Sequence, residues 1–179
     1  MSNHNAVILA GGFGTRLSHQ FPGIPKPMVP ISGVPILERI IAECKTYGYV
    51  DILLVLHHLP DQIIMHFGDG SNFGVAIEYH IESEPMGTGG ALLSVRELLA
   101  ETFLVLYADV FTSVNLSYFS QFHKDKCADI SIVVHPNDHP FDSDLIIIDG
   151  DKRVVAFDAP PHDGPDILAN VVNAALYLV

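Results

Sequence analysis

The chain has 179 residues, of which 49% are hydrophobic and only 17% charged, so its length favours one domain with a sizeable core. Its net charge of −12, with nine Lys and Arg, argues against a nucleic-acid-binding surface, although a small phosphorylated ligand needs only two or three well-placed cations. No apolar run is long enough to span a membrane and the start, "MSNHN", lacks a secretory signal, so we expect a cytoplasmic protein.

Apolar runs typical of buried strands alternate with amphipathic helical segments over most of the chain. The run "NAVILA" at residues 5–10 predicts a buried strand from its β-branched content. The segment 35–48 predicts a helix with five apolar side chains on one face, and Gly48 suits its end. Further strands are expected at 51–58, 75–82, 102–109 and 128–135, and further helices at 60–68, 88–100 and 116–127.

The last part of the chain predicts β-structure without helices. Residues 143–159 are typical of a β-hairpin that turns at Asp149-Gly150-Asp151, and 171–179 predict a final strand. Together the elements indicate an α/β fold, a mainly parallel mixed sheet flanked by helices, with a β-hairpin insertion in a single domain over residues 1–179. Because the chain stops inside a strand, we expect a protein truncated at its C-terminus. A ligand is expected beyond the carboxyl ends of the strands.

Both cysteines, Cys44 and Cys127, lie in segments predicted to be helical. Two cysteines in a protein expected in the cytoplasm are usually small buried or half-buried thiols. We therefore expect no disulfide between them.

A glycine-rich loop follows the first predicted strand. Gly11, Gly12 and Gly14 leave backbone N–H groups free to approach a phosphate closely. A dinucleotide-binding fingerprint would need a third glycine at the position of Leu17, and a P-loop would need a Gly-Lys-Ser/Thr sequence that is absent. Both of these common phosphate-binding motifs are excluded.

The loop "LAGGFGTRL" (9–17), followed by "PKPM" (25–28), resembles the signature of the sugar nucleotidyltransferase family, also called nucleotide-sugar pyrophosphorylases. Three later segments resemble family strands in the same order, namely "IEYHIESEPMGTGGAL" (77–92), "LVLYADVF" (104–111) and "VNAALY" (172–177). The resemblance implies a Rossmann-like, GT-A-like nucleotidyltransferase fold. It also implies an enzyme that transfers a nucleoside monophosphate from a nucleoside triphosphate to a sugar 1-phosphate, with Mg²⁺ as cofactor and release of pyrophosphate.

This chemistry assigns catalytic roles to Arg16, Lys26 and Asp109. Arg16 would bridge phosphate oxygens, Lys26 would be fixed between two prolines with its charge toward the phosphates, and Asp109 would bind the metal. Alone, Arg16 would more often be a surface salt-bridge residue and Asp109 a cap or turn residue. Their order at strand ends favours the catalytic interpretation. The resemblance also implies nucleotide contacts at Leu9, Ala10, Gly11, Gly12, Gly14, Thr15, Glu82, Gly87 and Thr88, and a sugar contact at Asn173.

The base and the sugar stay open between several members of the family. The Glu82 carboxylate could accept two hydrogen bonds from guanine, but the same position is acidic in relatives that use other bases, so uridylyl, cytidylyl and thymidylyl transfer remain alternatives. The segment 133–145 resembles the branch that makes GDP-activated heptoses, whose close relatives use mannose 1-phosphate and some of which carry a fused phosphatase domain. GTP with heptose or mannose 1-phosphate is the favoured pair.

The same segment contains a group of possible metal ligands, but its prolines and its Asn-Asp pair favour a rigid turn. The residues concerned are His135, Asp138, His139, Asp142 and Asp144.

Two departures from the family pattern predict low activity for these 179 residues alone. Residues 157–164, "FDAPPHDG", lack the lysine that relatives use to hold the sugar phosphate. The family's second metal carboxylate would lie beyond Val179. A nucleotide-binding regulatory module is therefore the alternative to an enzyme, although the presence of the arginine, lysine and aspartate disfavours it. A homo-oligomer is also compatible with the sequence.

Overall fold

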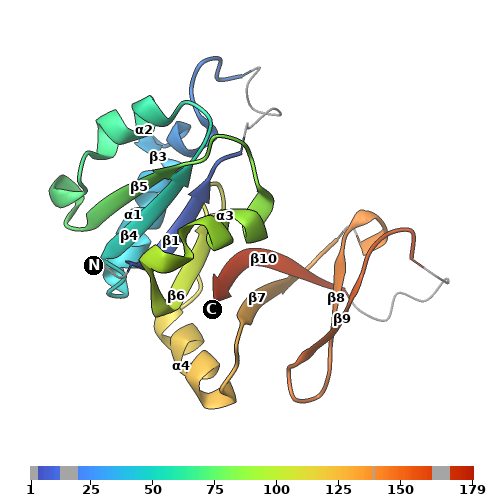
Figure 1. Ribbon diagram of the computed structural model, residues 1–179. Coiled ribbons are helices and arrows are strands. Elements are labelled where there is room, and N and C mark those ends of the chain that lie inside the picture. The colour runs from blue at the N-terminus through green and yellow to red at the C-terminus, as the bar shows by residue number, and fades with distance from the viewer. Residues whose placement is uncertain (1–3, 13–19, 139, 163–169) are drawn as a thin grey trace.

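A computed structural model describes residues 4–12, 20–138, 140–162 and 170–179. Its centre is a six-stranded sheet with the strand order β5-β4-β1-β6-β10-β7 (Figure 1). Parallel pairing joins β5, β4, β1 and β6, whereas β10 runs antiparallel to both of its neighbours. These strands are β1 (His4–Ala10), β4 (Asp51–Leu56), β5 (Ala76–Ile81), β6 (Leu99–Tyr107), β7 (Ser131–Pro136) and β10 (Val171–Leu178). The predicted mainly parallel mixed sheet is confirmed.

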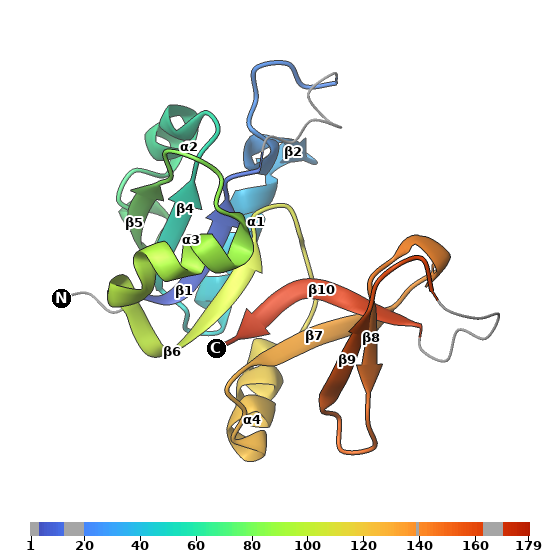
Figure 2. The same ribbon diagram turned by 45° about the vertical axis from the view of Figure 1, so that its right-hand side comes forward.

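Helices cover both faces of this sheet, as the strand–helix alternation predicts. Side chains of α1, α2 and α4 pack in one apolar core with one face of the sheet, and α3 packs on the opposite face (Figure 2). The helices are α1 (Ile36–Thr46), α2 (Pro60–Phe67), α3 (Gly87–Val95) and α4 (Leu116–Lys126), with short 3-10 turns at Lys26–Met28, Ser71–Phe73, Arg96–Leu98 and Pro140–Asp142. None of the helices in the described ranges has the length and apolar character needed to cross a bilayer.

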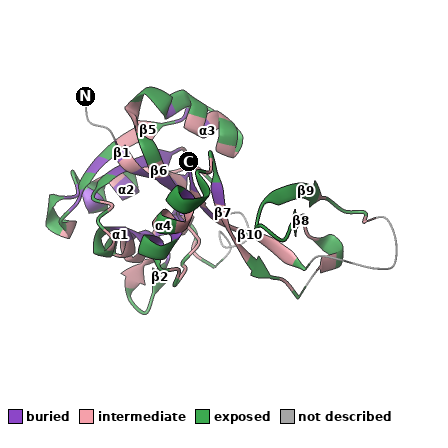
Figure 3. Cartoon of the chain, turned by 90° about the horizontal axis from the view of Figure 1, so that it is seen from below, coloured by how far each residue is buried: buried purple, intermediate pink, exposed green. Residues whose placement is uncertain are grey.

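The two cores follow from the two-residue period of the strands. In β1, Ala6 and Ile8 face the core with α1 and α2, whereas Val7 faces the core with α3. Strands buried on both faces need continuous apolar sequence, which explains runs such as "DILLVL" in β4. Figure 3 shows the buried residues concentrated in this sheet and exposed residues on the hairpin beyond it.

The predicted hairpin forms as β8 (Leu145–Ile148) and β9 (Val154–Asp158), and it projects from the sheet beside β7 and β10 (Figure 1). Its turn lies where the sequence predicts it. The Asp149 carboxylate oxygen Oδ1 accepts hydrogen bonds from the backbone N–H groups of Asp151 and Arg153 at 2.9 and 2.8 Å. The side chain therefore fixes the turn.

A second, smaller hairpin was not predicted from the sequence. It consists of β2 (Pro30–Ile31) and β3 (Val34–Pro35). Ser32 and Gly33 form its two-residue turn with φ of 52° and 81°. A Ser-Gly pair between two apolar pairs is a turn signal that could have indicated it.

The predicted helix over 88–100 is too long. The α-helix α3 ends at Val95, and β6 begins at Leu99, which pairs with His4 of β1. Pairing with a strand distant in sequence overrides the helical pattern of this segment.

The two thiols differ more than the sequence indicates. Both cysteines are free, as expected, and Cys44 is buried. Burial raises the pKa of the Cys44 thiol to about 12. Cys127 follows the end of α4 with φ of 46° and is exposed, so the expectation of a buried or half-buried thiol is wrong there.

Candidate functional site

A cavity of about 260 Å³ lies at the carboxyl ends of β1 and β6, between these strands and the start of α3. This is the edge at which parallel α/β sheets bind ligands. Its walls are mostly apolar with a few polar groups, which is typical of a small-molecule site. The lining residues are Leu9, Ala10, Gly11, Gly12, Lys26, Pro27, Val55, Glu82, Pro85, Gly87, Thr88, Ala91, Tyr107, Ala108 and Asp109.

Glu82 is a carboxylate held at the wall of this cavity with only 7% of its surface exposed. Its backbone continues the β4–β5 ladder, because its N–H donates to the Leu56 carbonyl at 2.8 Å. The ring nitrogen Nδ1 of His57 lies 2.9 Å from the Glu82 carbonyl oxygen, which ties the ends of the two strands together. The side-chain oxygen Oε1 is buried and has no hydrogen-bond partner among the described residues. A buried acceptor without a donor is costly, so this oxygen is suited to a ligand N–H group.

Gly11 makes room for this carboxylate. A Cβ atom at Gly11 would lie 2.9 Å from Glu82 Oε2 and 3.5 Å from His57 Cβ. The first distance is shorter than real Cβ contacts allow. A side chain at Gly11 would therefore force the Glu82 carboxylate to shift, so the protein's own packing favours the bare backbone here, as a phosphate would.

Lys26 and Asp109 form an ion pair at the same cavity, although they are 83 positions apart. Lys26 begins a 3-10 turn closed by hydrogen bonds from Met28 N–H to the Pro25 carbonyl and from Val29 N–H to the Lys26 carbonyl. Asp109 follows β6, and the adjacent Ala108 N–H extends the ladder by donating to Leu9 at 3.0 Å. Both side chains stay about one-third exposed, so their charges remain accessible to a ligand.

Two tyrosines connect the cavity with β10. The hydroxyl groups of Thr88 and Tyr107 are hydrogen-bonded at the cavity wall, and Asn173 Nδ2 donates to the Tyr177 hydroxyl. Burial raises the pKa of Tyr177, which also interacts with Tyr107. Asn173 does not line the cavity itself, but these contacts link it to Thr88.

The structure brings together all of the described residues that the sequence assigns to the catalytic and nucleotide groups: Leu9, Ala10, Gly11, Gly12, Lys26, Glu82, Gly87, Thr88 and Asp109. Gly14, Thr15 and Arg16 lie outside the described residues. The sequence did not single out Tyr107 or His57. Tyr107 ends a buried strand two residues before Asp109, which is a signal that could have found it, whereas His57 carries no such signal.

In its described part, the segment 133–145 comprises the end of β7, a hydrogen-bonded connection with a 3-10 turn at Pro140–Asp142, and the first residue of β8. Asn137 Nδ2 donates to Ser143 Oγ at 2.6 Å, and His135 Nδ1 donates to the Pro136 carbonyl at 2.7 Å. Among the residues that the structure describes, no group of three or more His, Cys, Asp or Glu side chains is placed to hold a metal ion. These contacts favour the rigid-turn interpretation; His139 lies outside the described residues.

Comparison with known proteins decides the family. A family model described as "Nucleotidyl transferase" matches residues 5–178. The chain belongs to this family. A mannose-1-phosphate guanylyltransferase of Mycobacterium tuberculosis is 33% identical over 181 residues, which cover 99% of this chain and 50% of that protein. A D-glycero-alpha-D-manno-heptose 1-phosphate guanylyltransferase of Campylobacter jejuni is 39% identical over 112 residues, which cover 63% of this chain and 50% of that protein.

The comparison with a solved structure supports the same family assignment. HddC from Yersinia pseudotuberculosis, crystallised with GMP-PN, superposes with a TM-score of 0.78 and 30% identity over 100% of this chain and 76% of that chain. The chain thus shares its fold with the matched part of HddC. The chain spans about half the length of the curated relatives it matches.

Proposed function

We propose that the chain forms the nucleotide-binding part of a guanylyltransferase that transfers GMP from GTP to mannose or heptose 1-phosphate. The observation that carries this proposal is the buried, unpartnered Glu82 Oε1 beside Gly11, in a cavity that also holds Lys26 and Asp109. The names of the M. tuberculosis and C. jejuni relatives support the same base and the same class of sugar.

Glu82 would select the base. The Watson–Crick edge of guanine presents two adjacent N–H donors, N1–H and N2–H₂, and a carboxylate has two acceptor oxygens to meet them. Uracil and thymine present one donor on that edge, so they leave one carboxylate oxygen unpaired. Because such an unpaired buried acceptor is penalised, the site favours guanine over these bases.

The cations would hold the triphosphate. The loop at Gly11 and Gly12 leaves backbone N–H groups close to the cavity, and the start of α3 at Gly87 adds more at a helix N-terminus. Lys26 would exchange part of its pairing with Asp109 for phosphate oxygens, and Arg16 would neutralise charge on the leaving pyrophosphate.

Asp109 would hold Mg²⁺. Its carboxylate is partly exposed at the cavity, and hard oxygen ligands of this kind suit Mg²⁺. Asp109 would supply one carboxylate to this coordination, and substrate phosphates would supply further oxygen ligands. The ion, when bound, would neutralise phosphate charge and polarise the α-phosphate.

The reaction then needs little beyond positioning. A phosphate oxygen of the sugar 1-phosphate attacks the α-phosphorus of GTP, the bond to the β-phosphate breaks, and pyrophosphate leaves with the electron pair. Two polyanions must meet, so orientation and charge neutralisation dominate the rate. The phosphate nucleophile is already ionised at neutral pH, so no protein base is required. Asn173 is proposed to contact the sugar.

Binding of the four nucleoside triphosphates tests the base, and pyrophosphate release tests the reaction. We expect GTP to bind the chain most tightly. We expect pyrophosphate to be released slowly when mannose or heptose 1-phosphate and Mg²⁺ are present, with glucose 1-phosphate a poorer acceptor. Glu82→Gln should weaken GTP about 10- to 150-fold, the value of one hydrogen bond to a charged group, and leave UTP unchanged. Lys26→Ala should abolish release with every substrate pair. Equal binding of all four triphosphates, or an unchanged preference in Glu82→Gln, would contradict the proposal.

A further inference from the structure

A second cavity lies away from the nucleotide site, between α4, β7 and the β8–β9 hairpin. Its volume is about 720 Å³, within the range of small-molecule sites. It shares no lining residue with the first cavity. The residues that line it are Phe122, Lys126, Cys127, Ala128, Asp129, Ile130, Ser131, Ile132, Val134, Ile148, Lys152, Arg153 and Val154. In Figure 1, α4 and β7 stand on one side of this space and the hairpin on the other.

The charge of this cavity is opposite to that of the protein. Three of the nine Lys and Arg residues of the chain line it, namely Lys126, Lys152 and Arg153, against one carboxylate, Asp129. In a chain with a net charge of −12, a cavity with an excess of positive charge is a local exception. Such an exception attracts anions from solution.

Two of these cations converge on one aromatic ring. The ammonium nitrogens of Lys126 and Lys152 lie 5.9 and 5.8 Å from the centroid of the Phe122 ring. Lys126 also donates a hydrogen bond to the Asp151 carbonyl at 2.9 Å, which connects α4 to the hairpin turn. Because the two lysines come from different elements, the fold itself brings like charges together here.

No carboxylate neutralises these cations in the described part of the chain, where none of Lys126, Lys152 and Arg153 forms an ion pair. Two acids close to these cations in the sequence, Asp149 and Asp125, have other partners. Asp149 accepts from two backbone N–H groups of the turn, and Asp125 accepts from Gln121 Nε2 at 2.7 Å. The positive charges of these three side chains therefore stay available to an anionic ligand.

We propose that this cavity binds a small phosphorylated molecule at a site separate from the nucleotide cavity. Its phosphate groups would pair with Lys152, Arg153 and the remaining donors of Lys126. The rest of the molecule would contact the apolar side chains that line the cavity, namely Ile132, Val134, Ile148 and Val154. The volume of about 720 Å³ is typical of small-molecule sites, so a small molecule is the proposed occupant rather than an acidic peptide.

Cys127 supplies a direct reporter of this site. It lines the cavity and is exposed, whereas Cys44 is buried. A neutral reagent such as iodoacetamide should therefore alkylate Cys127 selectively in the native chain, and peptide mass spectrometry gives its rate. Inorganic pyrophosphate and GTP, both without Mg²⁺ and at matched ionic strength, serve as probes. A bound probe should slow alkylation saturably, by about tenfold at ten times its dissociation constant.

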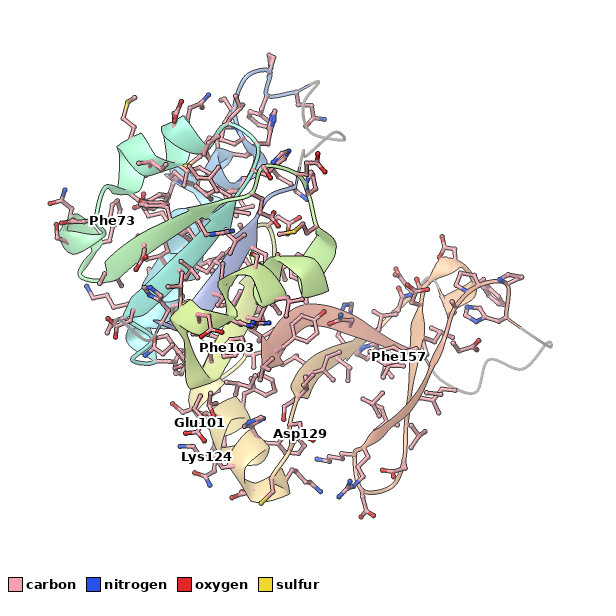
Figure 4. All side chains as sticks on the ribbon, viewed as in Figure 1. Phe73, Glu101, Phe103, Lys124, Asp129 and Phe157 are labelled. Carbon is pink, nitrogen blue, oxygen red and sulfur yellow. The ribbon has the colours of Figure 1, made fainter. Side chains whose placement is uncertain are left out.

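Matched variants separate this site from the nucleotide cavity and from general charge effects. Lys152→Ala combined with Arg153→Ala should abolish the protection. Lys124→Ala, which removes a cation from the side of α4 away from the hairpin, should retain it (Figure 4). Lys26→Ala should also retain it, since Lys26 belongs to the other cavity.

The proposal is overturned if neither probe protects Cys127, if protection survives in the double variant, or if Lys124→Ala loses protection equally. Arg153→Lys, which keeps the charge, should retain protection. The buried Cys44 should stay unreactive in the double variant, which shows that a loss of protection there is not caused by misfolding. Loss of protection in Lys26→Ala would also overturn it, because the effect would then come from the nucleotide cavity.

Discussion

Substitution of Gly11 by alanine should destabilise the protein even without a ligand. The added Cβ would lie 2.9 Å from Glu82 Oε2, about 0.5 Å inside the 3.4 Å at which ordinary contact begins, so the Glu82 carboxylate, which is only 7% exposed, must shift from its position at the cavity wall. Overpacking of this kind costs about 1–3 kcal/mol, and the lower entropy of the unfolded alanine chain offsets about 0.4–1 kcal/mol. The net loss of about 1–2 kcal/mol lowers the melting temperature by about 2–8 °C for a domain of this size.

Thermal unfolding followed by circular dichroism measures this loss, and Gly12→Ala is its control. Among the described residues nothing lies within 4 Å of a Cβ at Gly12, so that variant should melt at or slightly above the temperature of the unmodified chain. In a Glu82→Ala background the clash is absent, and Gly11→Ala should then cost little. The reasoning is refuted if Gly11→Ala melts no lower than Gly12→Ala, or if its cost is the same in both backgrounds.

Two further predictions concern stability. Asn115 caps α4 by accepting a hydrogen bond from the Tyr118 N–H at 3.1 Å, so Asn115→Ala should lower the melting temperature by about 1–8 °C, whereas Ser117→Ala on the exposed helix surface should not. Burial raises the pKa of Cys44 from 9.0 to about 12 and that of Tyr79 from 10.0 to about 12. Because the folded state keeps these protons, the stability they provide is complete below about pH 9 and is lost as the pH rises toward about 12. Urea unfolding at several pH values across this window should show the loss of unfolding free energy, and Cys44→Ala should show a smaller loss. An equal slope of unfolding free energy against pH in that variant would contradict the role given to Cys44.

The parts of the fold set by local patterns could be predicted from the sequence. The run 5–10 is predicted to be a buried strand from its β-branched content, and in the structure its side chains alternate between the two cores. Gly48 is predicted to end a helix, and its φ of 83° is one that glycine adopts readily. Pairing between distant segments could not be predicted. Leu99 belongs to a strand only because it lies opposite His4, and the local sequence favours a helix there.

The same limit applies to the site. The motif placed Gly11, Lys26 and Asp109 near a common ligand, and the cavity contains all three. It could not indicate that Lys26 and Asp109 pair with each other, because two segments 83 residues apart must first fold against the same strand ends. The role of His57 was also hidden, since its contact is to the backbone of Glu82 and depends on the register of β4 with β5.

The position of β10 in the sheet has a consequence for how the chain folds. Its second half pairs with β6 on one side, whereas both of its ends pair with β7 on the other, so β7 reaches the six-stranded sheet through β10. During synthesis, β5, β4, β1 and β6 can assemble once residue 107 is available, but β7 must wait for residues 171–178. Until then one edge of β6 is unpaired, and an unpaired edge is where chains aggregate. We therefore expect insertion of β10 to be the late step of folding and the point at which the nascent chain is most vulnerable.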